Sequence, residues 1–113
     1  MRLPTDATLL LGDGADPELG RVWREEQLPL RALGFNLAEL ENLETATIVA
    51  AGRGAAEAAE AAARLGFRTF LVSEDAAVEG VRSVAVVEAI AAARGARARE
   101  RWRAARAIGG LCQ

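Results

Sequence analysis

The chain has no histidine, no lysine and no tyrosine, and each absence removes a class of chemistry. Without histidine or lysine there is no Ser-His-Asp or Cys-His arrangement, no Schiff base and no Walker-loop lysine. All 14 basic residues are arginine, which stays protonated in proteins. General acid–base catalysis would therefore need a carboxylate whose pKa burial has raised, or the lone thiol. The composition argues against an enzyme.

Cysteine is equally scarce, because Cys112 is the only one among 113 residues. One cysteine forms no internal disulfide, and zinc needs several His or Cys ligands. Met1-Arg2 leads into a polar start without the apolar stretch of a signal peptide. No apolar run approaches the roughly 20 residues of a membrane span. We expect a cytoplasmic protein without membrane contact, and the composition indicates no particular cofactor.

Charge is divided unevenly along the chain. Residues 1–93 carry 8 Arg against 15 acids, a net −7, whereas residues 94–113 carry 6 Arg against one acid, a net +5. The arginines of the second segment surround Trp102 on a predicted helix over residues 96–108. This helix could dock on a protein partner or on a second copy. An overall charge of −2, few aromatics and no recognised motif argue against nucleic acid.

Apolar runs and glycine or proline breaks divide the chain into elements. Strands are predicted at 8–11, 45–51 and 68–73, where short apolar runs, β-branched in 45–51, end at glycine or acids. A helix should start at Asp16, a capping carboxylate before Pro17, and should end near Leu28 because Pro29 follows. A short helical turn is predicted at 36–43 and an alanine-rich helix at 55–65. The segment 83–94 could start as a strand, but its periodicity favours a helix.

Strands that alternate with helices indicate a parallel sheet with helices on both faces. We predict one small doubly wound, three-layer α/β domain over residues 1–113, with a mostly parallel sheet of three or four strands and a C-terminal Arg-rich helix. So small a sheet buries little apolar surface, and a partner subunit would add to its stability. A homo-oligomer or a complex with another protein is therefore expected.

Two Gly-x-Gly loops follow predicted strands and precede predicted helices, at 12–14 and 52–54. Ligands of parallel sheets bind at the carboxyl ends of the strands, where glycine allows close backbone approach. Glu74 and Asp75 follow the second loop at about the offset of the ribose-binding acid in dinucleotide folds. The candidate ligand-binding residues are Gly12, Gly14, Gly52, Arg53, Gly54 and Asp75.

Other observations at these loops favour a plainer interpretation. Glu57 stands where the dinucleotide motif has its third small residue, and Asp13 and Asp16 would repel a phosphate. Glycine is also what an ordinary strand-to-helix turn needs. A third hypothesis is that Asp13, Asp16, Glu74 and Asp75 converge on Mg²⁺, which prefers carboxylate oxygens.

The segments "ATIVAAGRGAAEAAEAAARLGFRTFLVSED" (46–75) and "VRSVAVVEAIAAAR" (81–94) resemble the last part of a response-regulator receiver domain. "LGF" at 65–67 and "FLV" at 70–72 carry most of the match. The resemblance implies a flavodoxin-like fold. The strand-four Thr or Ser of that family falls on Ala51, the strand-five Lys on Ser73, and the acidic pair is reduced to Asp13. The resemblance therefore implies a degenerate version that is not phosphorylated.

Taken together, the sequence favours a non-catalytic regulatory or accessory domain. It would bind a protein partner or assemble with itself through the C-terminal helix. The alternative is a Rossmann-like domain that binds a nucleotide or Mg²⁺ with its Gly-x-Gly loops at the carboxyl edge of the sheet.

Overall fold

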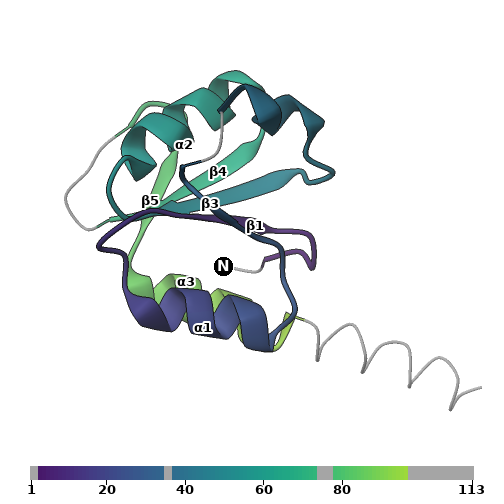
Figure 1. Ribbon diagram of the computed structural model, residues 1–113, viewed down its shortest axis with the longest axis vertical. Helices are drawn as coiled ribbons and strands as arrows, with labels where there is room; N and C mark the ends of the chain where they lie inside the picture. The colour runs from purple at the N-terminus through teal and green to yellow at the C-terminus, as the bar shows by residue number, and fades with distance from the viewer. Residues whose placement is uncertain (1–2, 35–36, 74–77, 97–113) are drawn as a thin grey trace, which may run out of the picture.

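The computed structural model describes residues 3–34, 37–73 and 78–96. A parallel sheet lies between two layers of helices (Figure 1). In chain order the elements are β1 (Thr8–Leu11), α1 (Pro17–Glu25), β2 (Leu30–Ala32), the 3₁₀ helix η1 (Leu37–Asn42), β3 (Thr47–Ala51), α2 (Ala55–Arg64), β4 (Arg68–Val72), β5 (Arg82–Val84) and α3 (Val86–Ala93).

The sheet has five strands in the order β2-β1-β3-β4-β5, and every neighbouring pair is parallel. Leu9 in the central part of the sheet lies opposite Leu30 of β2 on one side and Val49 of β3 on the other. The chain first winds outward to β2 and then returns to the other side of β1. The winding direction therefore reverses between β1 and β3. The predicted three-layer α/β class is confirmed, but the sheet has five strands rather than three or four.

Of the two additional strands, β2 follows the predicted end of the first helix near Leu28, and β5 lies at the start of a segment that was expected to be helical. Helix α1 ends at Glu25 rather than near Leu28, and Gln27 in a left-handed conformation (φ 57°) turns the chain toward β2. The predicted helix over 83–94 instead begins at Val86, after an extended Ala85. Residues 82–84 pair with β4, where Ser83 lies opposite Leu71. Such pairing joins distant segments, so local periodicity does not reveal it.

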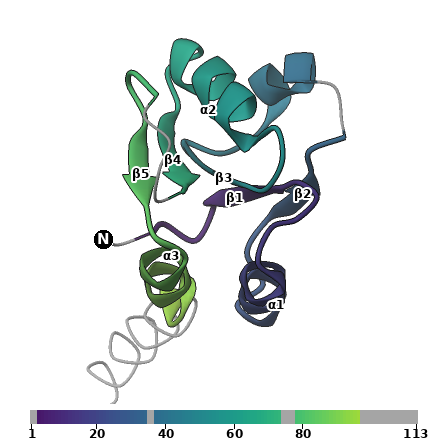
Figure 2. The ribbon, with the colours of Figure 1, turned by 90° about the vertical axis from the view of Figure 1, so that its left-hand side faces the viewer.

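Alternate residues of the central strands face two separate cores. Leu9, Val49 and Phe70 point toward α1 and α3 and share one buried cluster with them. Leu10, Ile48 and Leu71 point to the opposite face, where α2 and η1 complete a second cluster. Figure 2 shows α1 and α3 together on one side of the sheet and α2 on the other. Burial on both faces explains why these strands read as continuous apolar runs.

Helix α2 can approach the sheet closely because the residues on its inner face are small. Ala55, Ala58, Ala59 and Ala62 are all buried and recur at three- and four-residue steps. Helix α1 is different, since Leu19, Val22 and Trp23 provide a bulky inner face. The indole Nε1–H of the fully buried Trp23 donates a hydrogen bond of 3.0 Å to the carbonyl of Ala7, just before β1. This bond fixes α1 against the start of the central strand.

Several further expectations concern membranes, partners and the C-terminal segment. Among the described residues, no helix is long and apolar enough to cross a membrane. The predicted Arg-rich helix over 96–108 lies outside the described residues except for Ala96, which is buried. Docking through that helix, self-assembly and a cytoplasmic location stay predictions.

Trp23→Phe should destabilise the fold by about 2–4 kcal/mol, because the carbonyl of Ala7 loses its buried donor and the smaller ring leaves a void. Urea unfolding followed by far-UV circular dichroism measures the change. Val87→Ala is the control, since Val87 is 77% exposed and should shift stability by less than about 0.5 kcal/mol. Equal effects in the two variants would contradict the role of Trp23.

Candidate functional site

The two Gly-x-Gly loops meet at one edge of the sheet, because β1 and β3 are adjacent parallel strands and both loops follow their carboxyl ends. The loops bind each other directly. The backbone N–H of Gly12 donates to the carbonyl of Ala51 at 2.8 Å, and the N–H of Arg53 donates to the carbonyl of Asp13 at 2.8 Å. The prediction that both loops share one rim of the molecule is therefore confirmed.

The first glycine of each loop is required by the contact between the loops. A Cβ atom at Gly12 would lie 2.5 Å from the carbonyl oxygen of Arg53, and one at Gly52 would lie 2.5 Å from the carbonyl oxygen of Gly12. Gly52 also has a left-handed backbone, with φ 97°. At these two positions glycine allows two backbones to touch. The plainer interpretation, a turn that needs glycine, accounts for Gly12 and Gly52.

The second glycine of each loop has a different surrounding. Gly14 (φ 78°) and Gly54 (φ 84°) also have left-handed backbones, but a Cβ at either position would meet nothing within 4 Å. Gly54 is the N-cap of α2, and no side chain caps that helix. These two glycines therefore border open space rather than the opposite loop.

That open space is a depression of about 410 Å³ at the carboxyl edge of the sheet. Gly14 and Gly54 line it together with the first turns of α1 and α2, the ends of β3 and β4, and Val86 at the start of α3. Its floor is apolar, with Leu71 and Val72 from β4, and Ser73 adds a hydroxyl. The depression is of a size that accommodates a small organic molecule.

The predicted site residues are only partly brought together. Gly14, Gly52 and Gly54 line the depression, whereas Gly12 lies behind them against the backbone of Arg53. The side chain of Arg53 is exposed on its loop. Asp75 lies outside the described residues, so its role as a ribose-binding acid stays a prediction. The lining from β4 and α3 was missed, although the carboxyl-edge rule for parallel strands extends to β4.

The Mg²⁺ hypothesis requires the carboxylates of Asp13, Asp16, Glu74 and Asp75 to come together at this edge. Asp16 caps α1, with its Oδ1 accepting the N–H of Glu18 at 2.9 Å. Within residues 3–34, 37–73 and 78–96 no group of three or more His, Cys, Asp or Glu side chains could hold a metal ion. Glu74 and Asp75 lie outside these ranges. The four-carboxylate site therefore stays a prediction.

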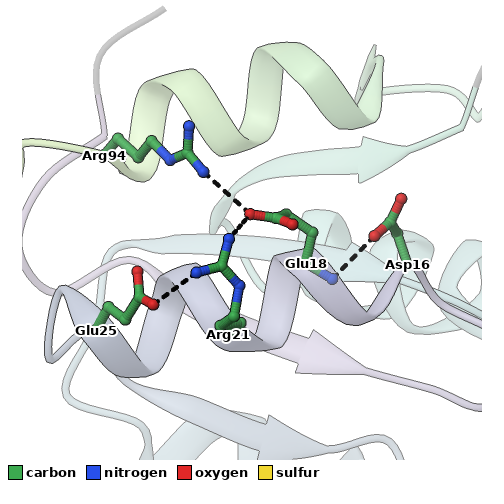
Figure 3. A network of polar contacts seen from close by, with 5 residues as sticks. All are labelled: Asp16, Glu18, Arg21, Glu25 and Arg94. Atoms are coloured by element: carbon green, nitrogen blue, oxygen red, sulfur yellow. Dashed lines mark hydrogen bonds and ion pairs between the residues drawn. The ribbon is translucent and has the colours of Figure 1, made fainter.

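A network of ion pairs links the start of α1 to the end of α3 (Figure 3). Glu18 receives hydrogen bonds from Arg21 and from Arg94, the latter at 3.0 Å, and Arg21 also bridges Glu25 at 2.7 Å. The hydrogen bond to Glu18, followed by the charges of Glu18 and Glu25, raises the pKa of Arg21. The charge of Glu18 is thus neutralised by two arginines, whereas Asp16 points away from them.

None of the comparisons with known proteins found a relative of this chain. No protein-family model matches the chain, and no curated protein or solved structure is significantly similar to it. The receiver resemblance therefore stays an untested expectation, and function rests on the geometry of the site alone.

Gly52→Ala and Gly54→Ala form a matched pair, because both replace a glycine of positive φ and only one of the new Cβ atoms meets backbone. Gly54→Ala should cost about 1 kcal/mol of stability for the left-handed conformation. Gly52→Ala should cost about 3 kcal/mol or more, since the contact between the loops must also open. Thermal and urea unfolding measure both values. Similar losses in the two variants would show that the loop contact is not tight.

Proposed function

We propose that this chain is a non-catalytic binding domain that holds a small molecule in the depression at the carboxyl edge of the sheet. The observation that carries the proposal is the coincidence of this depression with the edge where the winding direction reverses. In open parallel sheets, ligands bind outside the carboxyl ends of the strands near that reversal. The strand order supports the proposal, since it is the order of flavodoxin-like sheets.

The lining supports binding rather than catalysis. Leu19, Leu71 and Val86 contribute apolar side chains to the lining, and the first turn of α2, which no side chain caps, offers backbone N–H groups. A mostly apolar surface with a few polar groups is typical of small-molecule sites. The one carboxylate in the lining, Asp16, already accepts a hydrogen bond as the cap of α1. The lining is therefore suited to hold a small molecule.

A second depression, of about 490 Å³, lies beside α2 and the turn before β5. Its lining includes Glu60 and Arg64, which form an exposed ion pair with each other, and Glu79. It lies away from the strand ends of β1 and β3. Ligands of parallel sheets bind at the carboxyl ends of the strands. This rule favours the carboxyl-edge depression, although that depression is slightly smaller than the second one.

Binding of a protein partner through the C-terminal Arg-rich helix is the function that the sequence favours. Residues 97–113 lie outside the described residues, and the described contacts carry no argument for it. The two functions are compatible, because a ligand at the carboxyl edge contacts the starts of α1, α2 and α3, whereas the basic segment follows the end of α3.

Ala56→Phe should strongly weaken ligand binding, because the exposed Ala56 lies in the first turn of α2 and lines the depression, which the larger ring would fill. A collection of small aromatic and aliphatic fragments is screened by NMR against ¹⁵N-labelled protein. Fragments that bind should shift the amide signals of Gly14, Gly54 and Ser73, and at least tenfold weaker binding is expected in Ala56→Phe.

Ala91→Phe is the control for this experiment. Ala91 is exposed in α3 and does not line the depression. Binding should persist in this variant, and both variants should keep the dispersed amide spectrum of the native chain. Fragments that shift no amide at the carboxyl edge, or that bind Ala56→Phe unchanged, would refute the proposed function.

A further inference from the structure

The charges around the carboxyl-edge depression are strongly one-sided. Helices α1, α2 and α3 all begin at this edge, and each carries acidic residues at its start. The acids are Asp16 and Glu18 for α1, Glu57 for α2 and Glu88 for α3. The loop at 12–14 adds Asp13. Against them stands the exposed guanidinium of Arg53 in the loop at 52–54.

Ion pairs with arginine neutralise only one of these carboxylates. Glu18 is held by Arg21 and Arg94. In the described part of the chain no ion pair engages Asp13, Asp16, Glu57 or Glu88. Asp16 lines the depression, and Asp13, Glu57 and Glu88 lie within two residues of lining residues, as does Arg53. Four carboxylates therefore stand close to the rim against one guanidinium, and the other lining residues are uncharged glycine, alanine, leucine, valine and serine.

These acids also oppose the attraction that helix starts would exert on an anion. The N-terminus of a helix carries about half a positive elementary charge, which favours phosphates and carboxylates. A carboxylate in the first turn is a full negative charge and outweighs it. At α1 the cap is also occupied, because Asp16 already accepts the N–H of Glu18.

We infer that the depression selects an uncharged or cationic small molecule and rejects anions, phosphate-bearing molecules above all. The inference rests on the proposed function, since it concerns what the same depression binds. Its apolar floor on β4 would contact the body of the ligand, and Asp16 at the rim would accept a hydrogen bond from a hydroxyl or ammonium group. This class of ligand differs from the nucleotides that the Gly-x-Gly pattern by itself suggests.

The test uses three probes that share one indole body and differ in charge: tryptophol (neutral), tryptamine (cationic) and indole-3-acetate (anionic). Each is titrated into the full-length chain at low ionic strength while the amide signals of Gly14, Gly54 and Ser73 are followed. Tryptophol and tryptamine should bind, and indole-3-acetate should bind about tenfold more weakly than tryptophol. The difference should shrink at high salt, because exposed charges are screened.

A triple variant, Asp16→Asn with Glu57→Gln and Glu88→Gln, then removes three rim charges. Asparagine keeps the capping ability of position 16, so the fold should be retained, as circular dichroism and the amide spectrum can verify. Discrimination against indole-3-acetate should fall to about twofold.

The matched control removes the same number of charges at η1 and just after it, with Glu39→Gln, Glu41→Gln and Glu44→Gln. These three acids are exposed and do not line the depression. The tenfold discrimination should remain in this variant.

The outcomes separate the inference from the function on which it rests. If indole-3-acetate binds as tightly as tryptophol and Ala56→Phe strongly weakens both, the binding site stands and the inference is wrong. If the η1 variant loses discrimination as fully as the rim variant, the preference comes from net charge and the inference is also wrong. If none of the three probes shifts the carboxyl-edge amides, both the inference and the proposed function fail.

Discussion

The contact between the loops after β1 and β3 is the constraint on which the site depends. The two backbones are joined by hydrogen bonds from Gly12 to Ala51 and from Arg53 to Asp13. Any side chain at Gly12 or Gly52 would push them apart, since its Cβ would lie 2.5 Å from a carbonyl oxygen of the other loop. The two strands between which the winding reverses are therefore held together at their carboxyl ends.

This contact also decides where the free space lies. In an open parallel sheet the ligand crevice is expected between the two strands where the winding reverses. Here the two loops touch at that point, and the depression is lined by both loops together with the ends of β3 and β4 and the starts of α1, α2 and α3. The second glycines, Gly14 and Gly54, line this space, and a Cβ atom at either position would meet nothing within 4 Å.

The same edge shows why a Gly-x-Gly pattern is a weak indicator of nucleotide binding. Glycine meets two physical requirements here, close backbone contact at Gly52 and a left-handed turn at Gly54, and neither of them needs a phosphate. Under the proposed function, the carboxylates of Asp16, Glu57 and Glu88 at the helix starts have the sign opposite to the one that binding a phosphate requires. Charge at the helix starts therefore says more about the ligand than the glycines do.

Local chemistry in the sequence was sufficient for the α/β class, the central strands and the start of α1. Thr47, Ile48 and Val49 are β-branched and lead an apolar run, and Asp16 before Pro17 is a favourable start for a helix. These features depend on neighbouring residues, so a single chain reveals them. The shared edge of the two loops was also predictable, because consecutive parallel strands bring their carboxyl ends to one side.

Only the tertiary structure decided the two edge strands, the separate roles of the glycines and the lining of the depression. Leu30–Ala32 and Arg82–Val84 are three-residue edge strands that form because β1 and β4 offer them hydrogen-bonding partners, and no local pattern encodes such a partner. The separate roles of the first and second glycine in each loop, and the placement of Leu71 and Val86 in one depression, likewise follow from contacts between distant segments. The sequence determined which residues turn, cap and pack, whereas the assembled sheet determined which of them face one another.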